Sequence, residues 1–454
     1  MRRAARAGLP AVGLLVLVAA AARVTTAQEP PEREAAVIRE AFLHAWNGYE
    51  RYAWGHDELL PLSRGHRDWH PASLLMTPVD AYDTMLLMGL TDQAARAKTL
   101  ILDSLSFDRD FSVQVFEITI RLLGGLLSAH QMDGDPRFLA LARDLGNRLL
   151  PAFGSPTGMP YRFVNLRTGA VSGPVSNPAE VGTLMLEFGT LSRLTGEPRF
   201  YDAAKRAMVA LYRRRSPVGL VGSTIDVRTG AWIDTDSHVS GGIDSYYEYL
   251  LKSWLLFRDA DFRRMWDSSI AAVNRYLADQ RPDGLWYGHA DMDTGARTAT
   301  HYGALDAYFA AVLAKSGDTV RAGRLMGSIF RMWTTFGIEP EELDYVTMRP
   351  VSEGYELRPE ALESAYYLSR ITGDARYRAM ARTMLDSLFH YTRAETGFSA
   401  LASVVTRERR DRMESYFLAE TLKYAYLLFA PPSTLDFDAV VFNTEAHPLR
   451  RTWP

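Results

Sequence analysis

A repeated pattern constrains the fold of this chain more than any other feature of its sequence. An apolar helical segment, a short polar turn and a second helix that opens on an aromatic and basic pair recur along the chain. The clearest copies are residues 126–138, 191–201 and 368–377, and weaker copies are 90–93, 255–262 and 312–319. Intervals of roughly 40 to 65 residues are typical of helical-hairpin repeats. Each hairpin has to bury one face against its neighbours, so we predict a closed ring of helix pairs.

The turns of this repeat have the residues that end one helix and begin another. Gly follows the first helix, and an acidic residue or Pro begins the second. No linker or low-complexity run interrupts the series, and 47% hydrophobic residues are enough for a large core. We therefore predict one all-α domain over residues 32–450. A net charge of -3 gives no electrostatic reason to expect nucleic acid or an anionic membrane surface as a partner.

The first 27 residues have the pattern of a secretory signal peptide. Arg2, Arg3 and Arg6 precede an apolar run over 9–22, and small residues at 25–27 offer a cleavage site. The run is short for a membrane span, which makes an uncleaved anchor the weaker alternative. The chain has no Cys, so neither a disulfide nor a lipidated Cys holds it. We expect an exported protein, periplasmic or extracellular, of bacterial type.

Acidic residues occupy the segments that do not match the repeat and that should point into the ring. Glu117 and Arg121 are four residues apart within an apolar run, so they share a helix face that should be buried. Glu360 follows a Pro suited to a helix start. Asp244 follows two glycines, which let the backbone approach a ligand closely.

Each acid has a structural explanation when it is taken alone. Glu117 could pair with Arg121, Asp244 could cap the helix that follows it, and Glu360 could favour a helix dipole. Together, however, these acids would repel one another unless a cation or a sugar held them apart. Calcium fits best, because there is no Cys and no paired-His motif. Four histidines are interpreted as ordinary polar residues and none is assigned to metal: His66, His70, His238 and His301.

The stretch from Val440 to Pro448 predicts a short strand that ends in oxygen donors. Val440, Val441 and Phe442 form the strand pattern, and residues 443–445 then bring a hydroxyl, a carboxylate and free carbonyls. An ordinary polar turn is the alternative. Aromatic residues make up 11% of the chain, which suits either a carbohydrate cleft or helix packing. Two carboxylic groups across a pocket suit glycoside hydrolysis, which proceeds with inversion if they stand roughly 6.5 to 9.5 Å apart.

The chain resembles glycoside hydrolase family 47, the class I α-1,2-mannosidases, from about residue 41 to 448. The resemblance rests on the segments 45–49, 53–59, 79–85, 116–129, 244–252, 357–364, 420–424 and 442–448. It implies an (α/α)7 barrel that is plugged from one end by a C-terminal β-hairpin, with Ca²⁺ at the floor of the pocket.

The resemblance also implies a role for each matching residue. Thr444 would bind Ca²⁺ through its hydroxyl and its carbonyl. Glu117 matches the general acid, Glu360 the base that activates water, and Asp244 a third catalytic carboxylate that could share the acid role. The remaining matches are substrate-binding residues: Arg121, Arg358 and Pro359 for the terminal mannose, Glu180 for the next sugar, and Glu363, Glu420 and Glu445 for water or sugar hydroxyls.

Departures from the family point to one of its branches. Processing mannosidases usually have an Arg where this chain has Gly242, and a His-Leu-x-Cys-Phe run where it has residues 304–308. These features, the run 411–417 and the lack of a cysteine pair are similar to ER degradation-enhancing mannosidase-like proteins. They leave the linkage preference open.

The function expected from this resemblance is that of an exported, calcium-dependent, inverting exo-α-1,2-mannosidase. It would act as a monomer, without an obligate protein partner, on mannose-containing oligosaccharides or N-glycans. One alternative is a mannose-glycan binding or quality-control protein with weak or no hydrolysis. Another is a different helical-toroid sugar enzyme such as an epimerase, which would need a catalytic His pair that the sequence does not show.

Overall fold

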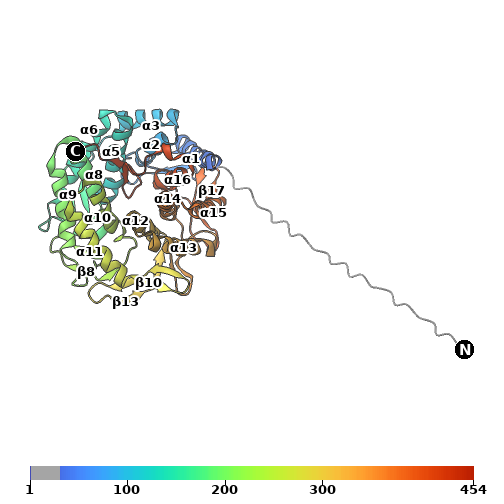
Figure 1. The fold of residues 1–454 in the computed structure, drawn as a ribbon. Coiled ribbons are helices and arrows are strands. Elements are labelled where there is room, and N and C mark those ends of the chain that lie inside the picture. The colour runs from blue at the N-terminus through green and yellow to red at the C-terminus, as the bar shows by residue number, and fades with distance from the viewer. Residues whose placement is uncertain (2–30, 454) are drawn as a thin grey trace.

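The helices form two concentric rings, as the computed structural model in Figure 1 shows. The structure describes Met1 and residues 31–453, so the predicted signal peptide at 1–27 lies, apart from Met1, outside the described residues. The inner helices are α2 (Met76–Leu87), α5 (Gly124–Asp133), α8 (Met185–Thr195), α10 (Asp244–Phe257), α12 (Phe309–Lys315), α14 (Glu360–Thr372) and α16 (Leu422–Phe429). The outer helices are α1 (Pro31–Tyr52), α3 (Thr91–Ser104), α6 (Pro136–Leu149), α9 (Pro198–Tyr212), α11 (Ala260–Tyr276), α13 (Thr319–Phe336) and α15 (Ala375–Thr392).

The inner ring is closed. Each inner helix packs against the next one, and the π-helical turn η4 (Phe417–Thr421), which leads into α16, packs against α2. Each inner helix also packs against the outer helix that follows it, and α16 packs against α1 at the other end of the chain. These contacts define an (α/α)7 barrel, so the predicted fold class is confirmed.

Burial patterns explain which helices lie inside. Along α9 the buried residues recur at helical spacing on one face: Phe200, Ala203, Ala204, Ala207, Met208 and Leu211. Such a one-sided pattern is typical of a helix with one face in solvent. By contrast, every residue of α10 from Ser245 to Ser253 is buried. A helix that is buried on all sides needs neighbours all around it, as the inner ring provides.

Short turns join the inner helices α2, α5, α8, α10, α12 and α14 to the outer helices that follow them. Gly134, Gly196 and Gly373 end α5, α8 and α14 with φ of +86°, +72° and +69°, a conformation that Gly adopts without steric cost. Asp374 then caps α15 by accepting a hydrogen bond from the Arg376 backbone N–H. The weaker copy at 255–262 lacks Gly, and Arg258 takes the left-handed conformation there instead, with φ of +58°.

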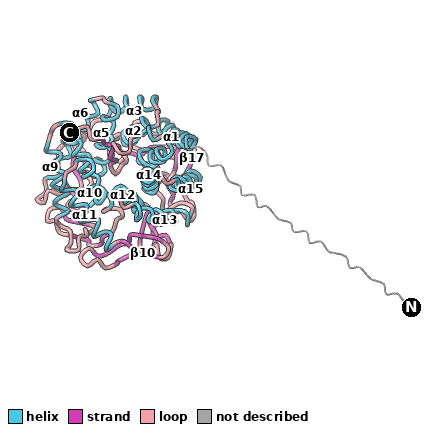
Figure 2. The backbone as a smooth tube through the Cα atoms, viewed as in Figure 1, coloured by secondary structure: helices cyan, strands magenta, loops and turns pink. Residues whose placement is uncertain are grey.

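The longer connections run from each outer helix to the next inner helix and therefore all lie at one end of the barrel. They contain short antiparallel strands, drawn in magenta in Figure 2, which the sequence analysis did not predict. Four three-stranded sheets join successive connections: β3 (Ser112–Gln114), β4 (Phe163–Asn165) and β5 (Val171–Ser172); β6 (Val175–Ser176), β7 (Thr224–Asp226) and β8 (Trp232–Asp234); β9 (Asp236–Ser237), β12 (His289–Asp291) and β13 (Arg297–Ala299); β14 (His301–Gly303), β15 (Glu342–Asp344) and β16 (Arg349–Ser352).

Four two-stranded sheets complete this strand rim: β1 (Glu58–Leu60) with β2 (Gly65–Arg67), β10 (Ala278–Arg281) with β11 (Gly284–Tyr287), β17 (Arg393–Ala394) with β18 (Gly397–Phe398), and β19 (Ala400–Leu401) with β20 (Arg409–Arg410). Short helical segments lie between the main helices: α4 (Val115–Ile118), η1 (Thr119–Leu123), η2 (Leu150–Phe153), α7 (Pro178–Gly182), η3 (Leu305–Tyr308) and η5 (Pro432–Thr434). No helix among the described residues is both long and apolar enough to span a membrane.

A C-terminal hairpin plugs the ring. Strand β21 (Val440–Phe442) pairs antiparallel with β22 (Pro448–Arg450), with Val440 opposite Arg450 and Phe442 opposite Pro448. β21 packs against α10 and β22 against α5, so the hairpin lies between inner helices. The predicted strand at 440–442 is therefore confirmed, and its turn reaches the centre of the barrel.

Candidate active site

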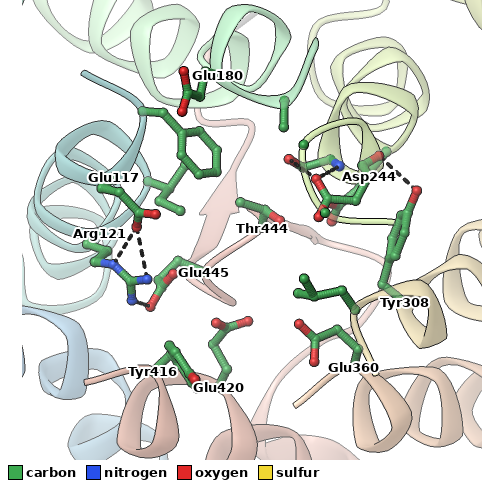
Figure 3. A pocket seen from close by; sticks show the side chains of 18 of the residues that line it. Glu117, Arg121, Glu180, Asp244, Tyr308, Glu360, Tyr416, Glu420, Thr444 and Glu445 are labelled. Atoms are coloured by element: carbon green, nitrogen blue, oxygen red, sulfur yellow. Dashed lines mark hydrogen bonds and ion pairs between the residues drawn. The ribbon is translucent and has the colours of Figure 1, made fainter. Parts of the chain in front are cut away.

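A cavity of ≈ 410 Å³ lies at the centre of the barrel (Figure 3). All eleven residues that the sequence singled out line it: Glu117, Arg121, Glu180, Asp244, Arg358, Pro359, Glu360, Glu363, Glu420, Thr444 and Glu445. The structure thus brings together residues that are far apart in the sequence. Their individual roles stay predictions.

The three predicted catalytic acids lie at the N-terminal ends of helical segments. Asp244 is the first residue of α10, Glu360 is the first residue of α14, and Glu117 lies in the short helix α4. These ends face the strand rim, because the outer-to-inner connections meet the inner helices there. The positive end of a helix dipole favours a carboxylate at such a position.

The turn of the plug forms the floor of the cavity. Asn443 holds this turn, because its Oδ1 accepts hydrogen bonds from the backbone N–H groups of Glu445 (3.0 Å) and His447 (2.8 Å). Its Nδ2 donates to the Ile120 carbonyl oxygen at 2.9 Å. Thr444, which Figure 3 shows at the end of the strand, donates its backbone N–H to the Tyr249 hydroxyl at 3.2 Å. The Thr444 hydroxyl makes no side-chain hydrogen bond among the described residues.

Arg121 joins the wall of the cavity to its floor. Its guanidinium lies 3.0 Å from Glu117 Oε2 and also contacts Glu445. The ring centroids of Trp69 and Tyr416 lie 5.2 Å and 5.5 Å from its guanidinium carbon. The pairing of Glu117 with Arg121, which the sequence left as an alternative, is therefore present and extends to the plug.

Two π-helical turns carry residues of this site. Arg121 lies in η1 and Glu420 in η4, each continuing directly into an inner helix. Glu420 lies inside this wider turn, and α16 begins two residues later at Leu422. Such turns are rare and occur frequently at functional sites.

Burial changes the acid–base properties of the floor. The pKa values of Glu360 and Glu363 are each raised to about 8, first by burial. Burial and the neighbouring carboxylates raise the pKa values of Glu420 and Glu445 well above the usual range. Burial also raises the pKa of Asp244 to about 7. The protein thus places carboxyl groups where they are hard to ionise without a compensating charge.

One carboxyl oxygen of Glu360, Oε2, is buried and has no hydrogen-bond partner among the described residues. Buried polar atoms in proteins are almost always paired. An unpaired carboxylate oxygen that lines a cavity therefore indicates a place for water or a polar ligand.

Arg358 and Asp244 are held by neighbours that the sequence analysis missed. Glu341 accepts two hydrogen bonds from Arg358, with Oε2 2.9 Å from Nη2 and 3.1 Å from Nε. Tyr308 donates its hydroxyl to the Asp244 carbonyl oxygen at 2.8 Å. Glu341 adjoins the unpredicted strand β15, so no sequence signal tied it to Arg358. Tyr308 lies in a run that was noted only as a departure from the family.

Glu180 is fixed at the wall by three polar side chains. Its Oε1 accepts from Gln114 Nε2 at 2.7 Å and lies 3.0 Å from Arg162 Nη2. Its Oε2 accepts from the Ser176 hydroxyl at 2.9 Å. Gln114 and Arg162 also line the cavity, and neither was identified from the sequence.

A buried charge network beneath the plug was also missed. Asp83 lies 2.7 Å from Lys423 Nζ through Oδ1 and 2.7 Å from His447 Nδ1 through Oδ2. None of the three side chains is more than 1% exposed. Asp83 and His447 lie in segments that the sequence analysis quoted, but only the tertiary structure shows that they meet.

One group of possible metal ligands lies away from the cavity. Within residues 31–453, Asp236, His238 and His289 form the one set of three His, Asp or Glu side chains whose ligand atoms lie within 4.8 Å of one another. This set differs from the predicted calcium site at Thr444. The sequence analysis had interpreted His238 as an ordinary polar residue.

A pocket that is closed at one end and lined by carboxyl groups suits a glycoside hydrolase. Such enzymes need an acid and a base on opposite sides of a sugar. The profile of Glycosyl hydrolase family 47 matches residues 41–451. The chain belongs to this family.

Relatives and a solved structure agree with this assignment. The chain is 37% identical to "Alpha-mannosidase I MNS5" of Arabidopsis thaliana over 442 residues, covering 91% of this chain and 76% of the relative. It is 38% identical over 448 residues to "ER degradation-enhancing alpha-mannosidase-like protein 2" of Homo sapiens, with the same coverage. The structure of the "alpha-1,2-mannosidase from Trichoderma reesei" matches with a TM-score of 0.86 at 30% identity, covering 93% of this chain and 100% of that chain.

Proposed function

We propose that this protein is an exported, calcium-dependent, inverting exo-α-1,2-mannosidase that releases terminal mannose from mannose-containing oligosaccharides or N-glycans. The observation that carries the proposal is the set of buried carboxyl groups around Thr444, including the unpaired oxygen of Glu360. The plug closes one end of the barrel, which suits removal of a chain end rather than cleavage within a chain. The names of the matched mannosidases support the substrate class.

The residues at the floor fit a calcium ion. Thr444 has a hydroxyl that makes no side-chain hydrogen bond among the described residues and a main-chain carbonyl, and the acids around it supply further oxygen atoms. Calcium binds six to eight oxygen ligands, and the chain has no Cys to make a softer site. Thr444 would hold the ion, and three acids would hold its waters or the sugar hydroxyls: Glu363, Glu420 and Glu445. The bound ion would supply the positive charge that lets these buried acids ionise.

The catalytic acids have environments that suit different steps. Glu360, once ionised, takes a proton from a water molecule whose oxygen then attacks the anomeric carbon. The glycosidic C–O bond breaks as an acid, Glu117 or Asp244, gives a proton to the leaving oxygen. Burial raises the pKa of Asp244 to about 7, so a large fraction of this group keeps a proton near neutral pH, as an acid requires. Burial raises the pKa of Glu360 to about 8, and the positive charge of the bound ion would lower it, as a base requires. Attack on the face opposite the leaving group inverts the anomeric configuration.

Gly242 opens the wall of the cavity beside Asp244. A Cβ added at this position would meet nothing closer than Asn177 Cγ at 3.8 Å, so space remains where processing mannosidases have an Arg. Gly242 has φ of +89°, a conformation that Gly adopts without steric cost, so this part of the wall is backbone without a side chain.

The proposal is tested with α-1,2-linked mannobiose, with the released anomer followed by NMR. We expect β-mannose as the first product in calcium buffer and none after chelation with EDTA. Glu360→Gln should lower kcat by about 10²- to 10⁴-fold, because the variant lacks the general base. Glu395→Gln, at a side chain that is 75% exposed, is the matched control and should retain activity.

Two results would overturn the proposal. α-Mannose as the first product would refute inversion, and full activity in metal-free buffer would refute the calcium requirement. If Glu360→Gln bound and released sugar no differently from the parent, the glycan-binding alternative would hold instead.

Export is tested separately, by expressing the full chain in a bacterium and sequencing the N-terminus of the periplasmic protein. We expect it to begin near Gln28.

A further inference from the structure

A cluster of metal-ligating side chains lies on the strand rim, outside the cavity. Asp236 lies in β9, His238 follows it, and His289 begins β12, which pairs with β9. None of the three lines the cavity. The connection that carries His238 continues to Asp244, where α10 begins. The cluster is therefore part of the segment that positions a candidate catalytic acid.

The three side chains are already close to one another. Their ligand atoms all lie within 4.8 Å, and His289 Nδ1 is 2.6 Å from Asp236 Oδ2. The two imidazole rings stack with their centroids 4.5 Å apart. His238 is buried, whereas the Asp236 side chain is 32% exposed, so one edge of the cluster is open to water.

Both histidines have nitrogens that suit a metal ion. His289 Nδ1 lies 2.6 Å from Asp236 Oδ2, so with its hydrogen on Nε2 the ring presents the Nδ1 lone pair to an ion bound at Asp236. His238 Nδ1 accepts a long hydrogen bond of 3.2 Å from the Ser240 backbone N–H. Because His238 Nδ1 accepts, the lone pair of the neutral ring is on Nδ1, and an ion bound there would replace this long hydrogen bond.

A further polar contact orients the carboxylate. Thr298 donates its hydroxyl to Asp236 Oδ1 at 2.7 Å. In metal sites, hydrogen bonds from surrounding residues to the ligands fix the orientation of those ligands. Beyond the cluster, the His301 ring lies with its centroid 5.8 Å from that of His289.

We propose that Asp236, His238 and His289 bind a divalent transition-metal ion such as Zn²⁺. Two imidazole nitrogens and one carboxylate oxygen form a ligand set that Zn²⁺ accepts, and water from the open edge completes the coordination. Calcium prefers oxygen ligands alone, so this site is chemically distinct from the floor at Thr444. The bound ion would join β9 to β12 and hold the connection that leads to Asp244. The proposal does not depend on the mannosidase activity.

The competing explanation is that His289 and Asp236 form only an ion pair between two strands. The chain offers a control of similar composition on another part of the rim. His56 Nδ1 lies 3.0 Å from Asp68 Oδ2, and its ring stacks on His66 with the centroids 3.4 Å apart. The His56 side chain is 36% exposed, and the ligand atoms of His56, His66 and Asp68 do not all lie within 4.8 Å of one another.

The test is a calorimetric titration of the full, calcium-saturated protein with Zn²⁺. We expect about one equivalent of Zn²⁺ to bind. His238→Ala and His289→Ala should each weaken binding by roughly 100-fold or more, because even the loss of a residue that only hydrogen-bonds to a metal ligand costs about 10- to 100-fold. His56→Ala should bind like the parent. The absence of saturable binding, or equal binding by the parent and both cluster variants, would overturn the proposal.

A second measurement uses the parent protein alone and therefore does not require the variants to fold. Co²⁺ added to the parent should give the visible absorption of a nitrogen-ligated ion, and Zn²⁺ should remove that absorption. Calcium in excess should leave it unchanged. Loss of the band on calcium addition, or no band at all, would refute the site.

Discussion

Removing the ammonium of Lys423 should destabilise the whole barrel, because this group neutralises a carboxylate beneath the plug. Lys423 is fully buried and lies 2.7 Å from Asp83 Oδ1. It also donates to the Ala446 carbonyl oxygen, in the turn of the plug, at 2.7 Å. Although burial alone raises the pKa of Asp83, Lys423 and His447 together bring it to about 2, so the carboxylate is charged. The network therefore ties the plug to α2 and α16 through charge.

The variant Lys423→Met keeps the unbranched stem and removes the charge. It leaves Asp83 buried with His447 as its one remaining cationic partner among the described residues. Breaking a buried pair by removing one partner costs about 3–5 kcal/mol. Since domains are stable by about 5–15 kcal/mol, this is a large share of the free energy of unfolding.

The assay is urea unfolding in EDTA, followed by tryptophan fluorescence. Arg263→Met is the matched control, because Arg263 lies 2.8 Å from Asp267 with both side chains about half exposed. Exposed pairs contribute about 0–1 kcal/mol. Adding Asp83→Asn to Lys423→Met should recover part of the loss, since it removes the unpaired charge. If the unfolding midpoint of Lys423→Met shifts no more than that of Arg263→Met, the reasoning about buried charge is refuted.

The same network predicts a pH dependence. Burial lowers the pKa of His447, but Asp83 and Asp80 raise it overall from 6.5 to about 9. Because folding raises this pKa, the stabilisation that protonated His447 provides is complete below pH 6.5 and is lost as the pH rises through 9. The shift corresponds to about 3 kcal/mol. His447→Gln should remove this loss of stability, and an unchanged profile would contradict it.

Two further predictions concern the plug and the acids of the floor. Gly124→Ala should destabilise the protein by about 1–3 kcal/mol, because the new Cβ would lie 2.5 Å from Asn443 Nδ2. The control is Gly327→Ala, where a Cβ meets nothing within 4 Å and should stabilise the protein by about 0.5–1 kcal/mol. Thermal unfolding of both variants is the measurement, and equal shifts would contradict the close packing of Gly124 against Asn443. In metal-free buffer, stability should fall as the pH rises from 4.5 to about 8, since Glu360 and Glu363 keep protons there that the unfolded chain has released. Calcium should reduce this fall, and a flat metal-free profile would refute the raised pKa values.

The repeating helices and the candidate acids could be predicted from the sequence alone. Helical periodicity and Gly-containing turns are local signals, so the boundaries at Gly196 and Gly373 could be predicted. Glu117 and Arg121 could be placed on one helix face, because four residues make about one turn. The strand at 440–442 could be identified in the same way.

The strand rim and the π-helical turns could not be predicted. The strands are two to four residues long, which is too short for a clear alternating pattern, and each gains its hydrogen bonds from another connection. The turns at Arg121 and Glu420 depend on packing around the cavity rather than on local preference.

The chain by itself determined that many acids would occur between helical hairpins, because hydrophobic spacing and turn residues act over a few positions. Only the tertiary structure decided which of them meet. Closure of the ring brings Glu117, Asp244 and Glu360 to one cavity, and the plug then adds Thr444 and Glu445 from the far end of the chain. Such contacts arise from the joint burial of distant apolar faces, which no local pattern encodes. For the same reason, Asp83 and Lys423 became visible as partners only after folding.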